Sequence, residues 1–320
     1  MTMLFRASAT GCLRGKKEKM KIVMSGATGF IGKKLAEELL KAGHSLVLLS
    51  RRENPSVSAG VQTQVWDARA LGPWVSRIDG ADAVINLAGE SIAAKRWTAE
   101  QKKKIIESRI YSTRAIAQAI QKAAVKPRVW VNASAVGYYG PVESGDVTEI
   151  SPRGAGFLAE TCEAWEKETL PAQPVTRVVL LRTGVVLDRG GGALSKMEFP
   201  FKIFAGGPLG SGRQWVPWIH RDDLIGLVLF IIQNERISGP VNGTAPEPVP
   251  MAEFCKSLGR VLRRPSWAPV PAFVLKIMLG EMSEMLLTGQ KAVPSKALRA
   301  GYRFHYPGLS SALRAIYGKL

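Results

Sequence analysis

The sequence predicts an α/β protein built on a doubly wound parallel sheet, with a smaller, mostly helical C-terminal region. Short apolar segments alternate with amphipathic helical segments over residues 21–187, and this alternation is typical of a parallel sheet. Each predicted strand is a near-continuous apolar run, as expected where helices cover both faces of the sheet. The 320 residues suffice for one large core and a smaller appended region.

The first elements form a strand–helix–strand unit. Residues 21–25 (KIVMS) predict a buried strand, and residues 33–42 predict a helix that ends at Gly43. Residues 45–49 (SLVLL) predict the second strand. The unit spans about 30 residues, which is the usual length of a βαβ unit.

The later elements continue the alternation. We expect strands at 61–65, 83–87, 128–132 and 178–181, and helices at 99–124, 160–168 and 222–234. Residues 188–217 are rich in glycine and proline and predict an irregular, partly mobile segment that covers the ligand site as a substrate lid.

Residues 25–32 (SGATGFIG) form a glycine-rich turn between the first strand and the first helix. Gly26 allows the tight turn, Gly29 allows a pyrophosphate to approach the backbone, and Gly32 allows close packing of helix on sheet. The helix N-terminus then offers free N–H groups to phosphates. The turn predicts a Rossmann-type dinucleotide site with contacts from Gly26, Thr28, Gly29, Phe30, Ile31 and Gly32.

The end of the second strand indicates which dinucleotide binds. An acid there would bind the ribose 2′-OH of NAD, whereas an arginine accommodates the 2′-phosphate of NADP. This strand ends in Ser50 and Arg51, and a guanidinium binds phosphate in a bidentate fork. The sequence therefore predicts NADP.

The net charge of +18 favours anionic ligands. Nucleic acid is disfavoured because no nucleic-acid-binding motif accompanies the basic residues. Three cysteines and three histidines, all widely spaced, argue against disulfides and against a metal site. The longest apolar run, residues 224–232, is far shorter than a membrane span of about 20 residues.

Three domains are predicted: a disordered basic tail over 1–20, an NAD(P)-binding Rossmann domain over 21–250 that includes the lid, and a helical domain over 251–320. Two interpretations of the tail stay open. It is either an extension of a cytoplasmic protein, which we prefer, or a presequence that directs the protein to an organellar matrix.

Several motifs resemble the extended short-chain dehydrogenase/reductase family, which includes the sugar-nucleotide epimerases. They are the glycine turn and residues 82–89 (DAVINLAG), 132–140 (NASAVGYYG) and 217–223 (PWIHRDD). The chain is most similar to the atypical, epimerase-like branch that ends in a C-terminal domain of unknown function. Segments 66–67, 87–90, 108–109, 182–187, 190–192, 258–260, 289–291 and 301–304 carry this likeness.

The resemblance spans residues 21–316 and implies further NADP contacts. Ser50 and Arg51 would bind the 2′-phosphate. The other implied contacts are Leu87, Ala88, Lys104, Arg109 and Val186.

The chain departs from the family at its catalytic pair, Tyr-x-x-x-Lys, in which lysine lowers the pKa of a proton-transferring tyrosine. Aligned on Glu166, these two places hold Leu158 and Cys162, and neither can do that work. Ser134 is then the candidate that polarises a substrate oxygen, and Tyr138 is the candidate proton donor.

The leading hypothesis is an NADP-dependent oxidoreductase or epimerase-like enzyme that acts on an unidentified small molecule. Its substrate would lie between the Rossmann domain and residues 188–316. The missing catalytic pair motivates an alternative, a non-catalytic NADP-binding regulator, for example in cell division. A charge-driven binder of nucleic acid or membrane surfaces ranks third. A homodimer also stays open.

Overall fold

The computed structural model describes residues 19–53 and 61–318. Its main sheet has seven strands in the order β11-β7-β5-β4-β1-β2-β3, and every neighbouring pair is parallel. The predicted doubly wound parallel sheet is therefore confirmed. The strands are β1 (Lys21–Ser25), β2 (Ser45–Ser50), β3 (Gln62–Val65), β4 (Ala83–Asn86), β5 (Val129–Ala135), β7 (Arg177–Thr183) and β11 (Gly239–Gly243).

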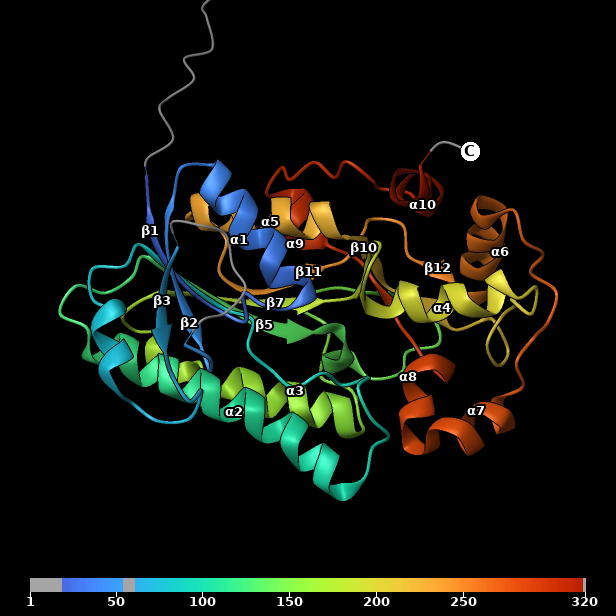
Figure 1. The fold of residues 1–320 in the computed structure, drawn as a ribbon, viewed down its shortest axis with the longest axis horizontal. Helices are drawn as coiled ribbons and strands as arrows, with labels where there is room; N and C mark the ends of the chain where they lie inside the picture. The colour runs from blue at the N-terminus through green and yellow to red at the C-terminus, as the bar shows by residue number, and fades with distance from the viewer. Residues whose placement is uncertain (1–18, 54–60, 319–320) are drawn as a thin grey trace, which may run out of the picture.

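Helices cover both faces of this sheet (Figure 1). One face carries α1 (Phe30–Lys41), α5 (Arg221–Gln233) and α9 (Ser295–Arg299), and the other carries α2 (Ala99–Lys122) and α3 (Phe157–Lys167). Successive strand residues point to opposite faces, so the five central strands β7, β5, β4, β1 and β2 supply two separate apolar cores. This two-sided burial explains the unbroken apolar runs in the sequence.

A third apolar core lies beyond the carboxyl end of the sheet. It gathers side chains of α4 (Gly192–Lys202), α6 (Met251–Leu262) and α10 (Leu309–Tyr317) around the buried Trp218. The short elements near it are β6 (Asp146–Val147), β8 (Val185–Leu187), β9 (Trp215–Val216), β10 (Trp218–His220), β12 (Val249–Pro250), β13 (Lys291–Ala292), α7 (Ala272–Leu279) and α8 (Glu284–Leu287). Single 3-10 turns are η1 (Pro73–Arg77), η2 (Val136–Tyr139), η3 (Leu170–Ala172) and η4 (Gly280–Ser283).

The segment 188–217 is more regular than predicted. Residues 192–202 form α4, although the sequence interpretation made the whole segment irregular. Leu194 and Phe201 lie two helical turns apart, and both are buried in the third core, so tertiary packing stabilises the helix. The glycine-rich composition belongs to the turns on either side of α4.

The predicted basic tail lies outside the described residues up to position 18. Met20, its last residue, is buried, and its backbone N–H donates to His44 Nδ1 at 3.2 Å. Within 19–53 and 61–318 no helix is long and apolar enough to cross a membrane. The domain boundary at residue 250 stays a prediction.

Candidate functional site

The carboxyl ends of β1, β2 and β4 meet at one edge of the sheet and line a cavity of about 530 Å³. Ligands of open parallel sheets bind at this edge, where the strand order reverses. Most of the predicted cofactor contacts come together here. Those that line the cavity are Gly26, Thr28, Gly29, Ser50, Arg51, Leu87, Ala88 and Lys104.

The glycines of the turn have different roles. Gly26 has φ +74°, and a Cβ there would lie 2.6 Å from the carbonyl carbon of Leu87. A Cβ on Gly32 would lie 2.2 Å from the Gly26 oxygen, whereas Gly29 meets nothing closer than 3.3 Å. Gly26 and Gly32 therefore keep strand, turn and helix close together, and Gly29 leaves the backbone open toward the cavity.

Three polar side chains fix the strand ends beneath the cavity. Ser25 and Asn86 end β1 and β4 and pair in register, and Asn86 pairs with Asn132 in the middle of β5. Ser25 Oγ donates to Asn86 Oδ1 at 2.6 Å, and Asn86 Nδ2 donates to Asn132 Oδ1 at 2.7 Å. Asn86 Oδ1 also accepts the backbone N–H of Ala88, which orients the loop that follows β4. The sequence interpretation missed this row, although polar residues at the ends of apolar strands were its signal.

The tip of β2 forms a cationic wall of the cavity. Arg51 is exposed, and the described residues offer it no acidic partner within ion-pair distance. Arg69, which the sequence interpretation missed, lines the same cavity and forms an ion pair with Glu107 at 3.5 Å. Hydrogen bonds from the backbone of Ala70 and Arg69 hold the pKa of Asp67 below its usual range. This wall combines the exposed Arg51 guanidinium, the ion-paired Arg69 and one fixed carboxylate, Asp67.

Helix α2 forms the opposite wall. Lys104 lines the cavity, and its hydrogen bond to Glu100 raises the pKa of Lys104. Gln101, also missed, is buried beside the cavity, and its Nε2 has no hydrogen-bond partner within the described part of the chain. A buried donor without a partner is uncommon and indicates a ligand or water at that position.

Arg109 supports the loop instead of lining the cavity. Its Nη1 donates to the backbone oxygen of Glu90 at 3.0 Å, and its guanidinium lies 5.0 Å from the ring centroid of Trp165. Burial lowers the pKa of Arg109. The side chain thus holds the loop that forms the cavity floor.

Phe30, Ile31, Gly32 and Val186 likewise lie outside the cavity lining. Phe30 and Ile31 pack on the core that contains Val186. A Cβ on Gly191 would lie 2.5 Å from the Phe30 ring, so the turn after β8 packs closely on α1. These residues fix the helix N-terminus against the rest of the fold.

The positions of the missing catalytic pair lie beside η2. A Cβ on Gly137 would lie 3.2 Å from Leu158 Cβ and 3.9 Å from Cys162 Sγ. Burial raises the pKa of Cys162 to about 12, so its thiol stays neutral at physiological pH. Leu158 has no titratable group and the Cys162 thiol carries no charge, so neither takes the place of the tyrosine or of the lysine.

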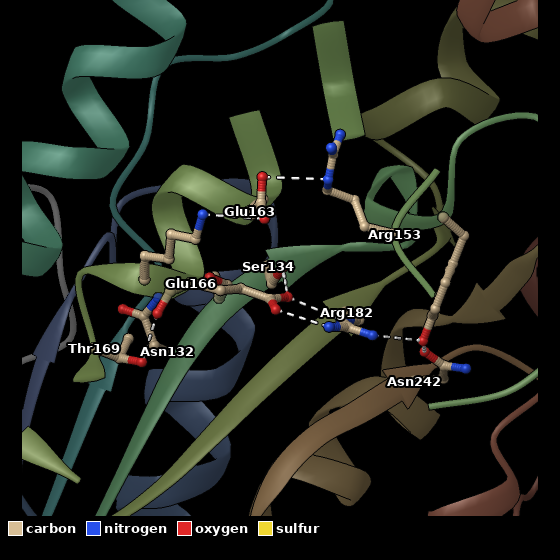
Figure 2. A network of polar contacts seen from close by, with 11 residues as sticks. Asn132, Ser134, Arg153, Glu163, Glu166, Thr169, Arg182 and Asn242 are labelled. Carbon is tan, nitrogen blue, oxygen red and sulfur yellow. Dashed lines mark hydrogen bonds and ion pairs between the residues drawn. The ribbon is translucent and has the colours of Figure 1, made fainter. Parts of the chain in front are cut away.

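Ser134 belongs to a buried network that crosses the ends of β5, β7 and β11 (Figure 2). Its Oγ donates to Glu166 Oε1 at 2.6 Å, and Glu166 accepts two hydrogen bonds from Arg182, at 2.9 and 2.8 Å. Arg182 Nη1 donates to the Tyr139 hydroxyl, which donates to Asn242 Oδ1. The Ser134 proton is therefore engaged within the protein.

Tyr138, the candidate proton donor, is half-buried and lies at the margin of this network. The Arg182 guanidinium carbon lies 3.5 Å from its ring centroid. Burial alone would lower the pKa of Arg182, but the hydrogen bonds and the charge of Glu166 outweigh it and raise that pKa. Tyr138 thus stacks on a permanent cation that its neighbours hold in place.

A parallel α/β sheet with a glycine turn and a cationic cavity at its carboxyl edge defines a Rossmann-type dinucleotide-binding protein. Residues 22–184 match the NAD dependent epimerase/dehydratase family, and residues 270–316 match a domain of unknown function, DUF1731. The chain belongs to the NAD dependent epimerase/dehydratase family. The resemblance that its motifs predict is confirmed.

Relatives resemble the chain over nearly its whole length. The chloroplastic SDR39U1 homolog of Arabidopsis thaliana is 43% identical, and the match covers 95% of this chain and 89% of the relative. Human epimerase family protein SDR39U1 is 38% identical over 93% of this chain and 99% of its own. The crystal structure of human SDR39U1 (isoform 2) with NADPH matches with a TM-score of 0.86 and 36% identity, over 94% of this chain and 100% of that one.

Proposed function

We propose that the chain binds NADPH in the cavity at the carboxyl edge and uses it to reduce or epimerise a small molecule. The observation that carries this proposal is the cationic tip of β2, where Ser50 and Arg51 face the cavity without an acid at the strand end. Gly29 leaves room for a pyrophosphate, and the unpartnered Gln101 Nε2 offers a donor. The human relative was crystallised with NADPH, which supports the choice of cofactor.

The bound cofactor would supply a hydride from nicotinamide C4. Leu87 and Ala88 would contact the cofactor through their backbone atoms. The Lys104 ammonium would balance the negative charge of its phosphates. Tyr138 would donate a proton to the substrate oxygen, and Ser134 would polarise that oxygen by turning its hydroxyl proton from Glu166 to the substrate. Arg109 would affect cofactor binding by holding the loop at Glu90 in place. Phe30 and Val186 would do so by packing the N-terminus of α1 against the core.

Replacing Arg51 with alanine will weaken NADPH binding by about 1–3 kcal/mol, because a charge-assisted contact to the 2′-phosphate is lost. NADH binding will change little, since NADH has no such phosphate. Isothermal titration of both nucleotides measures the difference.

Arg52→Ala is the matched control for this titration. Arg52 is exposed next to Arg51, and its backbone N–H donates to Ser50 Oγ, but its side chain does not line the cavity. Equal losses in both variants would indicate a general charge effect and contradict a 2′-phosphate site. Absence of NADPH binding to the unaltered protein would overturn the proposed function.

Replacing Tyr138 with phenylalanine will lower turnover of NADPH with a responsive carbonyl substrate by about 10²–10⁴-fold, the usual contribution of a positioned proton donor. NADPH affinity will stay the same, because Tyr138 does not line the cofactor cavity. The measurement is NADPH absorbance across a panel of aldehydes, ketones and nucleotide sugars. Unchanged turnover in the variant would rule out Tyr138 as the donor.

A non-catalytic NADP-binding regulator is the second candidate. Leu158 and Cys162 occupy the places of the catalytic pair, and the Ser134 proton is already donated to Glu166. Under this alternative NADPH binds tightly, and no member of the substrate panel consumes it. A protein partner, for example of the cell-division machinery, would then respond to the bound nucleotide.

The compartment is part of the proposal. We favour the cytoplasm, with an organellar matrix as the alternative if residues 1–20 direct transport. The Arabidopsis relative is chloroplastic by name, which adds weight to the organellar alternative.

A further inference from the structure

Six large apolar side chains are exposed on the chain after α4 and on the chain from residue 267 through α7. Helix α7 lies at the end of the molecule opposite β3 (Figure 1). Each is more than half exposed, and Ile277 reaches 71%. We call them the apolar patch: Ile203, Phe204, Trp267, Phe273, Ile277 and Met278. Single exposed apolar residues are ordinary, but gathered ones mark an interaction surface.

Local contacts bring the two halves of the patch together. Trp267 Nε1 donates to the Phe204 backbone oxygen at 3.0 Å, which links the chain after α4 to the chain before α7. A bridge between Leu209 and Val270 holds the same two segments side by side. On α7, Phe273 and Ile277 are one turn apart and share a face. The chain runs from Trp267 into α7 within five residues, so the patch residues lie on two adjoining segments.

The chain from residue 254 to the end of α7, which carries four of the six patch residues, is basic. Residues 254–280 contain five lysines and arginines and no aspartate or glutamate. The Arg264 guanidinium lies 4.5 Å from the ring centroid of Phe204, and Lys276 is exposed between Phe273 and Ile277. Exposed aromatic and aliphatic side chains with cations among them are typical of proteins that lie on anionic membranes.

We propose that the apolar patch docks on an anionic membrane surface. Its apolar side chains would enter the headgroup region, and the neighbouring cations would bind acidic headgroups. The charge favours this occupant over a second copy of the chain, because two copies would bring like charges together. Docking on a membrane surface requires no membrane-spanning helix, because only side chains enter the headgroup region.

The test is co-sedimentation of the full chain with phosphatidylcholine vesicles that contain or lack phosphatidylglycerol. We expect binding only to the anionic vesicles, and weaker binding at high salt. The double variant Phe273→Ser/Ile277→Ser will bind at least about tenfold more weakly, because less apolar surface is buried. Lys276→Glu will also weaken binding.

Ile150→Ser is the matched control, because Ile150 is 89% exposed but lies outside the patch. It should bind vesicles like the unaltered protein. NADPH titration of each variant reports whether its fold is intact. Failure of the unaltered protein to bind anionic vesicles would overturn the proposal. Equal binding by the double variant would also overturn it, because net charge alone would then explain the binding. Sedimentation velocity that shows a dimer lost in the double variant would assign the patch to a second copy instead.

Discussion

Replacing Glu166 with glutamine will lower the free energy of unfolding by about 3–5 kcal/mol, the usual cost of removing one partner from a buried ion pair. Arg182 is only 3% exposed, and Glu166 is its ion-pair partner. The amide would also place an NH₂ group against a guanidinium N–H, so that donor faces donor. Urea denaturation measures the loss.

Glu163→Gln is the control on the same helix (Figure 2). Glu163 forms ion pairs with Arg153 and Lys167 at 3.2 and 3.1 Å, but all three side chains are at least one-third exposed. Exposed ion pairs contribute about 0–1 kcal/mol, so this variant should be nearly as stable as the unaltered protein. Similar small losses in both variants would show that Arg182 finds solvent or another acceptor once Glu166 is changed.

The sequence predicts most of the fold because the chemistry that sets it is local. Strands β1, β2, β4 and β7 are continuous apolar runs, and helices with one apolar face separate them. Tertiary context decides the rest. β11 (GPVNG) carries little local strand signal and forms because it pairs with β7. Helix α4 was missed for the same reason, since its neighbouring glycines hide the spacing of Leu194 and Phe201.

The candidate site was predictable in part. The roles of Gly26, Ser50 and Arg51 could be predicted, because the geometry of the turn and of the strand end follows from the parallel βαβ unit. Gln101 and Arg69 were not, because their approach to the cavity depends on how α2 and the chain after β3 pack against the strand ends. Nor does a linear sequence show that the Ser134 hydroxyl faces Glu166, which lies 32 residues further along the chain.

Replacing Gly26 with alanine will destabilise the protein by about 2–6 kcal/mol and weaken NADPH binding by at least about tenfold. Two costs add. Left-handed backbone strains an L-residue by about 1–3 kcal/mol, and an overpacked contact costs about 1–3 kcal/mol more. At Gly26 φ is +74°, and the new Cβ would lie 2.6 Å from the backbone carbon of Leu87. The loop that follows β4 must then move away from the turn, which widens the cavity where the pyrophosphate would bind.

Gly43→Ala separates these two costs. Gly43 ends α1 with φ +87°, and a Cβ there meets nothing within 4 Å, so this variant carries only the backbone strain. It should lose about 1 kcal/mol of stability and keep its NADPH affinity. Thermal unfolding and NADPH titration of both variants make the comparison. If Gly26→Ala behaves like Gly43→Ala, the close approach of β1 to the end of β4 does not shape the cavity, and the glycine serves the turn alone.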